Sequence, residues 1–95
     1  MDIEKLAEHT RAAAAKLNVP AYVSTFVDVF TRKLPVPEDF YRVVVACDGR
    51  RPVSEVIGPV NCSDEELVRE HLSPAIQRAV LDLMTLRTPS TVDPV

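Results

Sequence analysis

The stretch PVPEDFYRVVVACDGRRPVSEVI, residues 35–57, is the most apolar passage of the chain and carries its own start and stop signals. Pro37 suits the first position of a helix, where its missing N–H removes no hydrogen bond, and the acidic pair Glu38 and Asp39 then faces the positive end of the helix dipole. An apolar stripe with helical spacing follows, formed by Phe40, Val43, Val44 and Cys47. We therefore predict a central helix that ends at Gly49.

The three consecutive valines at positions 43–45 support a different interpretation of the same stretch. β-Branched side chains favour the pleated surface of a strand. No Gly-rich or Asn-rich hairpin signal flanks the valines, which argues against a strand. The helix is the preferred interpretation, and the strand stays open as the alternative.

Length and composition indicate a single globular domain. The chain has 95 residues, of which 46% are hydrophobic and 26% are charged, a balance typical of folded proteins. Only two glycines and no tryptophan are present, which argues against an all-β fold with many tight turns. Half of the eight prolines stand immediately before apolar runs, where proline begins helices: Pro20, Pro37, Pro52 and Pro74.

Two helices are expected before the central one. Asp2 can cap the first of them, and Asn18 ends it. The second is expected from Pro20 to about Leu34, with apolar residues at helical spacing on its buried side.

Further short helices are expected after the central one. One runs over residues 52–57, and Ser63 with Glu66 forms a capping box that opens the next. Pro74 is expected to break or kink that helix, and Ser73 can cap a last one. The predicted fold class is all-α: a compact orthogonal bundle of five or six short helices over residues 1–88, with a flexible C-terminal tail at 89–95.

The segment VVVACDGRRPVSEVI, residues 43–57, resembles the helix–turn–helix part of winged-helix domains like the pyrroloquinoline quinone peptide chaperone and related bacterial regulatory modules. The residues that carry the resemblance are Asp48, Gly49, Arg50, Arg51, Val53, Glu55, Val56 and Ile57. It implies a helix-turn-helix within the bundle. It does not carry over the peptide-binding activity, because those chaperones begin with a small β-sheet where residues 1–34 read as two helices.

The sequence offers no set of residues for catalysis or metal binding. Cys47 and Cys62 are the only cysteines, and together with His71 they make an incomplete zinc ligand set. No phosphate-binding glycine loop, nucleophile elbow or zinc-protease motif is present. We therefore expect no catalytic residue, no cofactor and no metal, and we predict that the protein is not an enzyme. The lone cysteines, together with the lack of a signal segment or membrane span, predict a cytoplasmic location.

Five of the eleven basic residues fall within twenty positions and are the predicted partner-binding set: Arg32, Lys33, Arg42, Arg50 and Arg51. A net charge of −3 and a pI near 5.3 argue against nucleic acid as the partner, because binding to phosphates needs a basic surface. The expected function is a small non-catalytic adaptor or regulatory module that binds another protein or peptide, or a second copy of itself as a homodimer. The alternative is a DNA-binding transcriptional regulator of the helix-turn-helix type.

Overall fold

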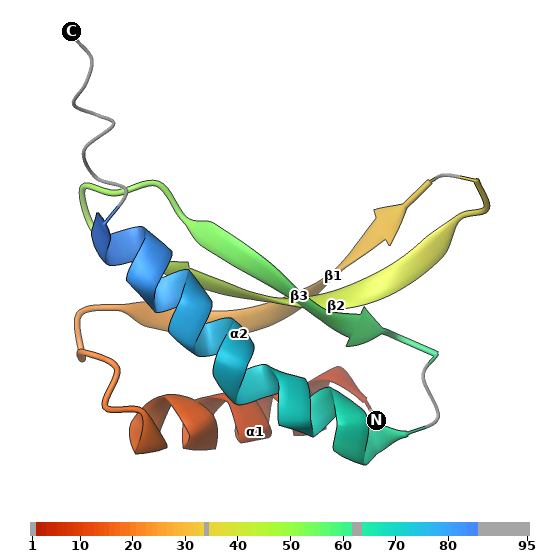
Figure 1. The fold of residues 1–95 in the computed structure, drawn as a ribbon, viewed down its shortest axis with the longest axis horizontal. Coiled ribbons are helices and arrows are strands. Elements are labelled where there is room, and N and C mark those ends of the chain that lie inside the picture. Colours follow the sequence, from red (N-terminus) through yellow and green to blue (C-terminus); the bar gives the residue numbers. More distant parts are fainter. Residues whose placement is uncertain (1, 34, 62–63, 86–95) are drawn as a thin grey trace, which may run out of the picture.

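The chain runs helix, three strands, helix in the computed structural model, which describes residues 2–33, 35–61 and 64–85 (Figure 1). The elements are α1 (Ile3–Lys16), β1 (Ser24–Arg32), β2 (Glu38–Ala46), β3 (Val53–Pro59) and α2 (Glu65–Thr85). The strands form one antiparallel sheet in the order β1-β2-β3. The fold is therefore mixed α and β, and the prediction of an all-α bundle of five or six helices is wrong.

Helix α1 forms where the sequence predicts it. The Asp2 carboxylate accepts a hydrogen bond of 2.8 Å from the backbone N–H of Lys5, which caps the helix start. Asn18 follows the helix with a φ of 58°, and the N–H of Val19 returns to the carbonyl oxygen of Ala14 at 3.1 Å. A left-handed residue followed by such a bond is a common way to end a helix, so both predicted boundaries are confirmed.

The three middle segments predicted as helices are strands, and the burial of β2 explains the error. Tyr41, Val43 and Val45 alternate along β2 and are buried against the helices. Val44 lies on the opposite face and is only 7% exposed, so apolar residues occupy both faces of the strand. A strand apolar on both faces loses its period of two, and here its residues also happen to match helical spacing. The strand alternative for residues 43–45 is correct.

Residues 43–57 form a β-hairpin, so the helix-turn-helix expected from the resemblance is wrong. The N–H of Arg50 donates to the carbonyl oxygen of Cys47 at 3.3 Å and closes a tight turn between β2 and β3. Gly49 has a φ of +81° in this turn. Gly49 therefore does mark the end of an element, as predicted, but that element is a strand rather than a helix.

Helix α2 is continuous where two helices were predicted. It spans 21 residues and passes through Pro74. The expected capping box depends on Ser63, which lies outside the described residues. The Asp64 carboxylate accepts hydrogen bonds from the N–H groups of Glu66 and Leu67, at 3.1 and 3.2 Å. The predicted tail, 89–95, also lies outside the described residues.

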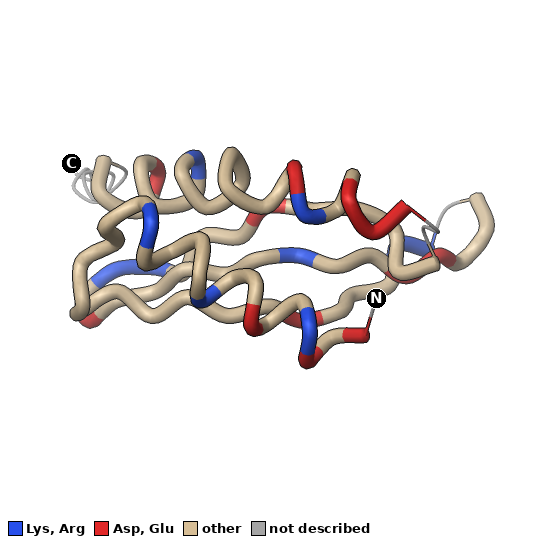
Figure 2. Tube along the Cα trace, turned by 90° about the horizontal axis from the view of Figure 1, so that it is seen from below, with Lys and Arg blue, Asp and Glu red and all other residues tan. Residues whose placement is uncertain are grey.

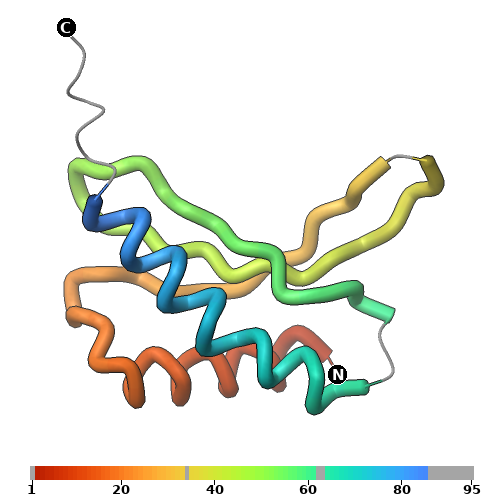
Figure 3. The backbone as a smooth tube through the Cα atoms, in the orientation of Figure 1, coloured from red at the N-terminus to blue at the C-terminus, as the bar shows by residue number. Residues whose placement is uncertain are grey.

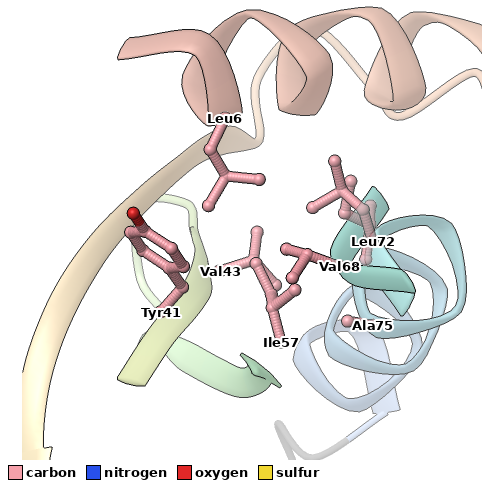
Figure 4. Close-up of a cluster of buried hydrophobic side chains, with 8 residues drawn as sticks. Leu6, Tyr41, Val43, Ile57, Val68, Leu72 and Ala75 are labelled. Atoms are coloured by element: carbon pink, nitrogen blue, oxygen red, sulfur yellow. The ribbon is translucent and has the colours of Figure 1, made fainter. Parts of the chain in front are cut away.

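The hydrophobic core lies between the two helices and one face of the sheet (Figure 4). Leu6 of α1 and Leu72 of α2 meet β2 and β3 at Val43 and Ile57. Ala75 and Ala79 are fully buried in α2, and such small side chains let a helix approach a sheet closely. Both helices therefore pack against the same face of the sheet. No described element covers the other face.

Replacing Gly49 by alanine should lower the free energy of unfolding by about 1 kcal/mol, because a Cβ disfavours the left-handed conformation. An added Cβ would meet no atom within 4 Å, so the loss reflects backbone strain rather than a clash. Gly58→Ala is the control, since Gly58 has no positive φ and its added Cβ would lie 3.8 Å from Val68. Urea unfolding of both variants checks the prediction, and an unchanged midpoint for Gly49→Ala would contradict it.

Candidate functional site

The face of the sheet opposite the helices is the candidate functional site. Strand register places Phe26 beside Val44, Asp28 beside Arg42, and Phe30 beside Phe40. Residues of β3 continue the same face, because Arg42 and Val44 pair with Val56 and Ser54. We call the following residues the open face: Phe26, Asp28, Phe30, Phe40, Arg42, Val44, Ser54 and Val56. None of them belongs to either core cluster that the helices form.

Aromatic rings and charges alternate in a row across the open face. The rings of Phe30 and Phe40 stack with centroids 5.8 Å apart and planes 29° from parallel. The guanidinium of Arg42 lies 5.2 Å from the Phe30 ring centre, and that of Arg32 lies 4.8 Å from the Phe40 ring centre. These are cation–π distances. The row is therefore ordered by its own contacts, without a ligand.

The charges at the centre of the open face neutralise each other. The Arg42 Nε donates to one carboxylate oxygen of Asp28 at 2.7 Å, and Nη2 donates to the other at 3.1 Å. This bidentate hydrogen bonding to Asp28 raises the pKa of Arg42. Both side chains remain about one third exposed. The pair therefore sits in an apolar setting but stays available to a partner.

Two of the exposed large apolar side chains lie on the open face. Phe26 is 48% exposed and Val56 is 42% exposed, and others such as Leu67 and Leu81 lie on α2. Exposed apolar side chains that share a face with aromatic rings favour contact with another macromolecule or a ligand. Figure 3 shows the β1–β2 hairpin, coloured orange to yellow, extending past the helices. The aromatic row lies close to the turn of this hairpin. The outer end of the row is therefore accessible from the edge of the molecule as well as from the open face.

The structure separates the five predicted partner-binding residues into two groups. Arg32 and Arg42 lie on the strands of the open face, and Lys33 follows directly after β1. Arg50 and Arg51 lie in the β2–β3 connection, at the opposite end of β2. The five side chains do not gather on one surface.

Arg50 has a structural contact that the sequence does not reveal. Its Nη1 donates to the backbone carbonyl oxygens of Leu83 and Met84, at 2.9 and 3.1 Å. These carbonyls lie in the last turn of α2, which contains no basic residue of its own. Arg50 therefore supplies the positive charge that the C-terminal end of a helix favours. Arg51 is exposed beside it.

The aromatic residues of the open face are the functional candidates that the sequence interpretation missed. Phe26 and Phe30 were assigned to the buried stripe of a helix, which hid them as surface residues. A signal was present, because Phe26, Asp28, Phe30 and Arg32 recur at every second position of STFVDVFTR. That period of two is typical of one face of a strand.

The described part of the chain contains no candidate metal site and no membrane-spanning helix. Within it, no three His, Cys, Asp or Glu side chains are arranged to hold a metal ion. Cys47 is a free thiol there, and Cys62 lies outside the described residues. Neither described helix combines the length and the apolar character that crossing a bilayer requires. Comparison with protein-family models, with curated proteins and with solved structures finds no match for this chain.

Proposed function

We propose that this protein is a small non-catalytic interaction module that binds another protein through the open face of its sheet. The observation that carries the proposal is the exposure of Phe26 and Val56 beside a stacked phenylalanine pair, on a face that no described helix covers. Aromatic and arginine side chains are enriched in the buried centres of protein interfaces. The open face combines both.

The charge distribution supports a protein partner over a nucleic acid. Figure 2 shows basic and acidic positions interspersed along the tube. On the sheet, Arg42 is already paired with Asp28, and on α2 the Nε of Arg78 pairs with Glu55 at 3.1 Å. Phosphate binding relies on unpaired cations that gather on one side of the molecule. The regulator alternative depended on a helix-turn-helix, and residues 43–57 form a hairpin instead, so we do not propose it.

Contacts among the side chains of the open face hold them in place before a partner binds. The central charges and rings of this face contact one another, so few side chains need to be ordered on binding, and ordering costs affinity. A cytoplasmic location is part of the same proposal, and the free thiol of Cys47 fits a reducing compartment.

Photo-crosslinking tests the proposal directly. A photoreactive phenylalanine analogue in place of Phe26 should attach to a protein in cells that express the full chain. The matched control carries the analogue in place of Leu67 on α2, which is 44% exposed on the helical side of the molecule. We expect crosslinked protein from position 26 and little from position 67. Equal crosslinking from both positions, no protein crosslink at position 26, or a crosslink to nucleic acid would each overturn the proposal.

A further inference from the structure

We propose that the open face is occupied by a second copy of this chain, packed sheet against sheet in a weak, reversible two-fold dimer. The inference rests on the proposed function and names its partner. Three properties of the open face carry it: its balanced charge, the arrangement of that charge across the strands, and its small area.

The charge on this side of the sheet sums to zero. Asp28 pairs with Arg42, and Arg32 stands opposite Glu38 in the β1–β2 register. Interfaces are selected by complementary potentials, so a strongly acidic or basic partner gains nothing at a neutral face. A face with equal numbers of both signs can instead be complementary to itself.

The position of the charges selects one arrangement of the two copies. Asp28 and Arg42 are direct neighbours across β1 and β2. A two-fold axis parallel to the strands and between β1 and β2 lays Asp28 of each copy over Arg42 of the other. An axis perpendicular to the strands would instead lay Asp28 over Asp28 and Arg42 over Arg42. The first arrangement gives four charges of alternating sign, and the second brings like charges together, so the first is favoured.

The same axis also matches the apolar residues. It places Phe30 of one copy over Phe40 of the other, and Phe26 over Val44, because these are also direct cross-strand neighbours. The half-buried rings of Phe30 and Phe40 then face each other across the dimer, and the exposed ring of Phe26 lies over the position of Val44, which is itself buried. Sheets packed face to face in this way keep their strands nearly aligned, at about −30°.

The area of the open face sets the expected strength of the dimer. Around this axis only β1 and β2 overlap with the other copy, because β3 of each copy lies beyond the edge strand β1 of the other. Strands about 4.8 Å apart with a rise of about 3.3 Å per residue then give a contact of roughly 300 Å² on each copy. Two copies would bury roughly 600 Å², below the 1,200 Å² or so at which stable specific complexes begin. A weak dimer that forms only at high protein concentration is therefore expected.

Sedimentation velocity of the purified full chain tests dimer formation. Between about 1 and 500 µM, a range suited to weak association, we expect the weight-average mass to rise from that of a monomer towards that of a dimer. Phe26→Thr removes the ring and keeps a residue with high strand propensity, so it should weaken dimerisation at least tenfold. Leu67→Gln, on the helical side, should leave it unchanged. A wild-type chain that stays monomeric at the highest concentration, or a loss in both variants alike, would overturn the proposal.

An exchange of the central charges tests the arrangement of the two copies, and it does not depend on the folding of Phe26→Thr. The double variant Asp28→Arg with Arg42→Asp keeps an ion pair within each copy and alternating signs across a dimer, so it should dimerise with itself. Mixed with the wild type, it would bring like charges together at both positions. We expect mixed dimers at least tenfold below the level of random pairing, measured by fluorescence energy transfer between differently labelled copies. Random mixing would contradict the proposed axis.

The two proposals fail in different ways. If position 26 crosslinks to a different protein and the purified chain stays monomeric, the dimer is wrong and the interaction module stands. If position 26 crosslinks to nothing and the chain is monomeric, both proposals fail. Crosslinking of position 26 to the same chain, with the concentration-dependent mass, supports both.

Discussion

Replacing Leu72 by alanine should lower the free energy of unfolding by about 3 kcal/mol. Leu72 is 2% exposed and packs in the cluster that joins α2 to α1, β2 and β3. The substitution removes buried methyl groups and leaves a cavity, because neighbouring elements fill it only in part. A domain of this size has a total stability of about 5–14 kcal/mol, so the loss is a large share of it.

Leu67→Ala is the matched control for this prediction. It makes the same chemical change in the same helix, but Leu67 is 44% exposed, so we expect a loss below about 1 kcal/mol. Thermal unfolding followed by circular dichroism should show a midpoint lowered by more than about 10 °C for Leu72→Ala. If the two variants had the same midpoint of thermal unfolding, the described packing of α2 on the sheet would be wrong.

The two ends of the chain differ in how far local sequence determined their structure. Helix α1 could be predicted because its start and end depend on short-range chemistry, an Asp2 cap and a left-handed Asn18. The existence of a helix around residues 65–85 was also predictable. The continuity of this helix was not predictable. Pro74 locally favours a break, but buried residues on both sides of it, such as Leu72 and Ile76, hold the helix against the core and override that preference.

The sheet could not be predicted because its defining contacts are long-range. Val44 lies on the face of β2 opposite Val43 and Val45, so three apolar residues follow one another and the sequence shows no strand alternation there. The β1–β2 connection contains Pro35 and Pro37 in place of an Asn-Gly turn, which removed the usual hairpin signal. Cross-strand neighbours such as Asp28 and Arg42 are fourteen positions apart, and only the register brings them together.

The same limit applied to the candidate site. Arg32 and Arg42 were selected for their charge, and the structure shows each of them lying over a phenylalanine ring. The rings themselves were overlooked, because a residue assigned to the core is not considered for the surface. Recognising the open face required knowing which side of the sheet the helices cover.

Replacing Arg50 by alanine should destabilise the domain by about 2 kcal/mol, and the neighbouring Arg51→Ala should change stability by less than about 0.5 kcal/mol. From the sequence, both arginines are predicted to bind a partner. The structure gives Arg50 two hydrogen bonds to the last carbonyl groups of α2, at 2.9 and 3.1 Å from its Nη1. Both acceptors lie in the last described turn of α2, so losing the guanidinium removes two hydrogen bonds and a favourable charge.

The two substitutions form a matched pair, because they remove the same side chain from adjacent positions of one turn. Urea unfolding should separate them clearly, and Arg50→Lys should fall between, since an ammonium keeps the charge but cannot reproduce the planar geometry. Neither arginine lies on the open face, so dimerisation of the folded Arg50→Ala and Arg51→Ala chains should match the wild type. Equal stability of Arg50→Ala and Arg51→Ala would show that the contact with α2 contributes nothing. A dimerisation defect in folded Arg51→Ala would move the interface from the open face to the β2–β3 turn.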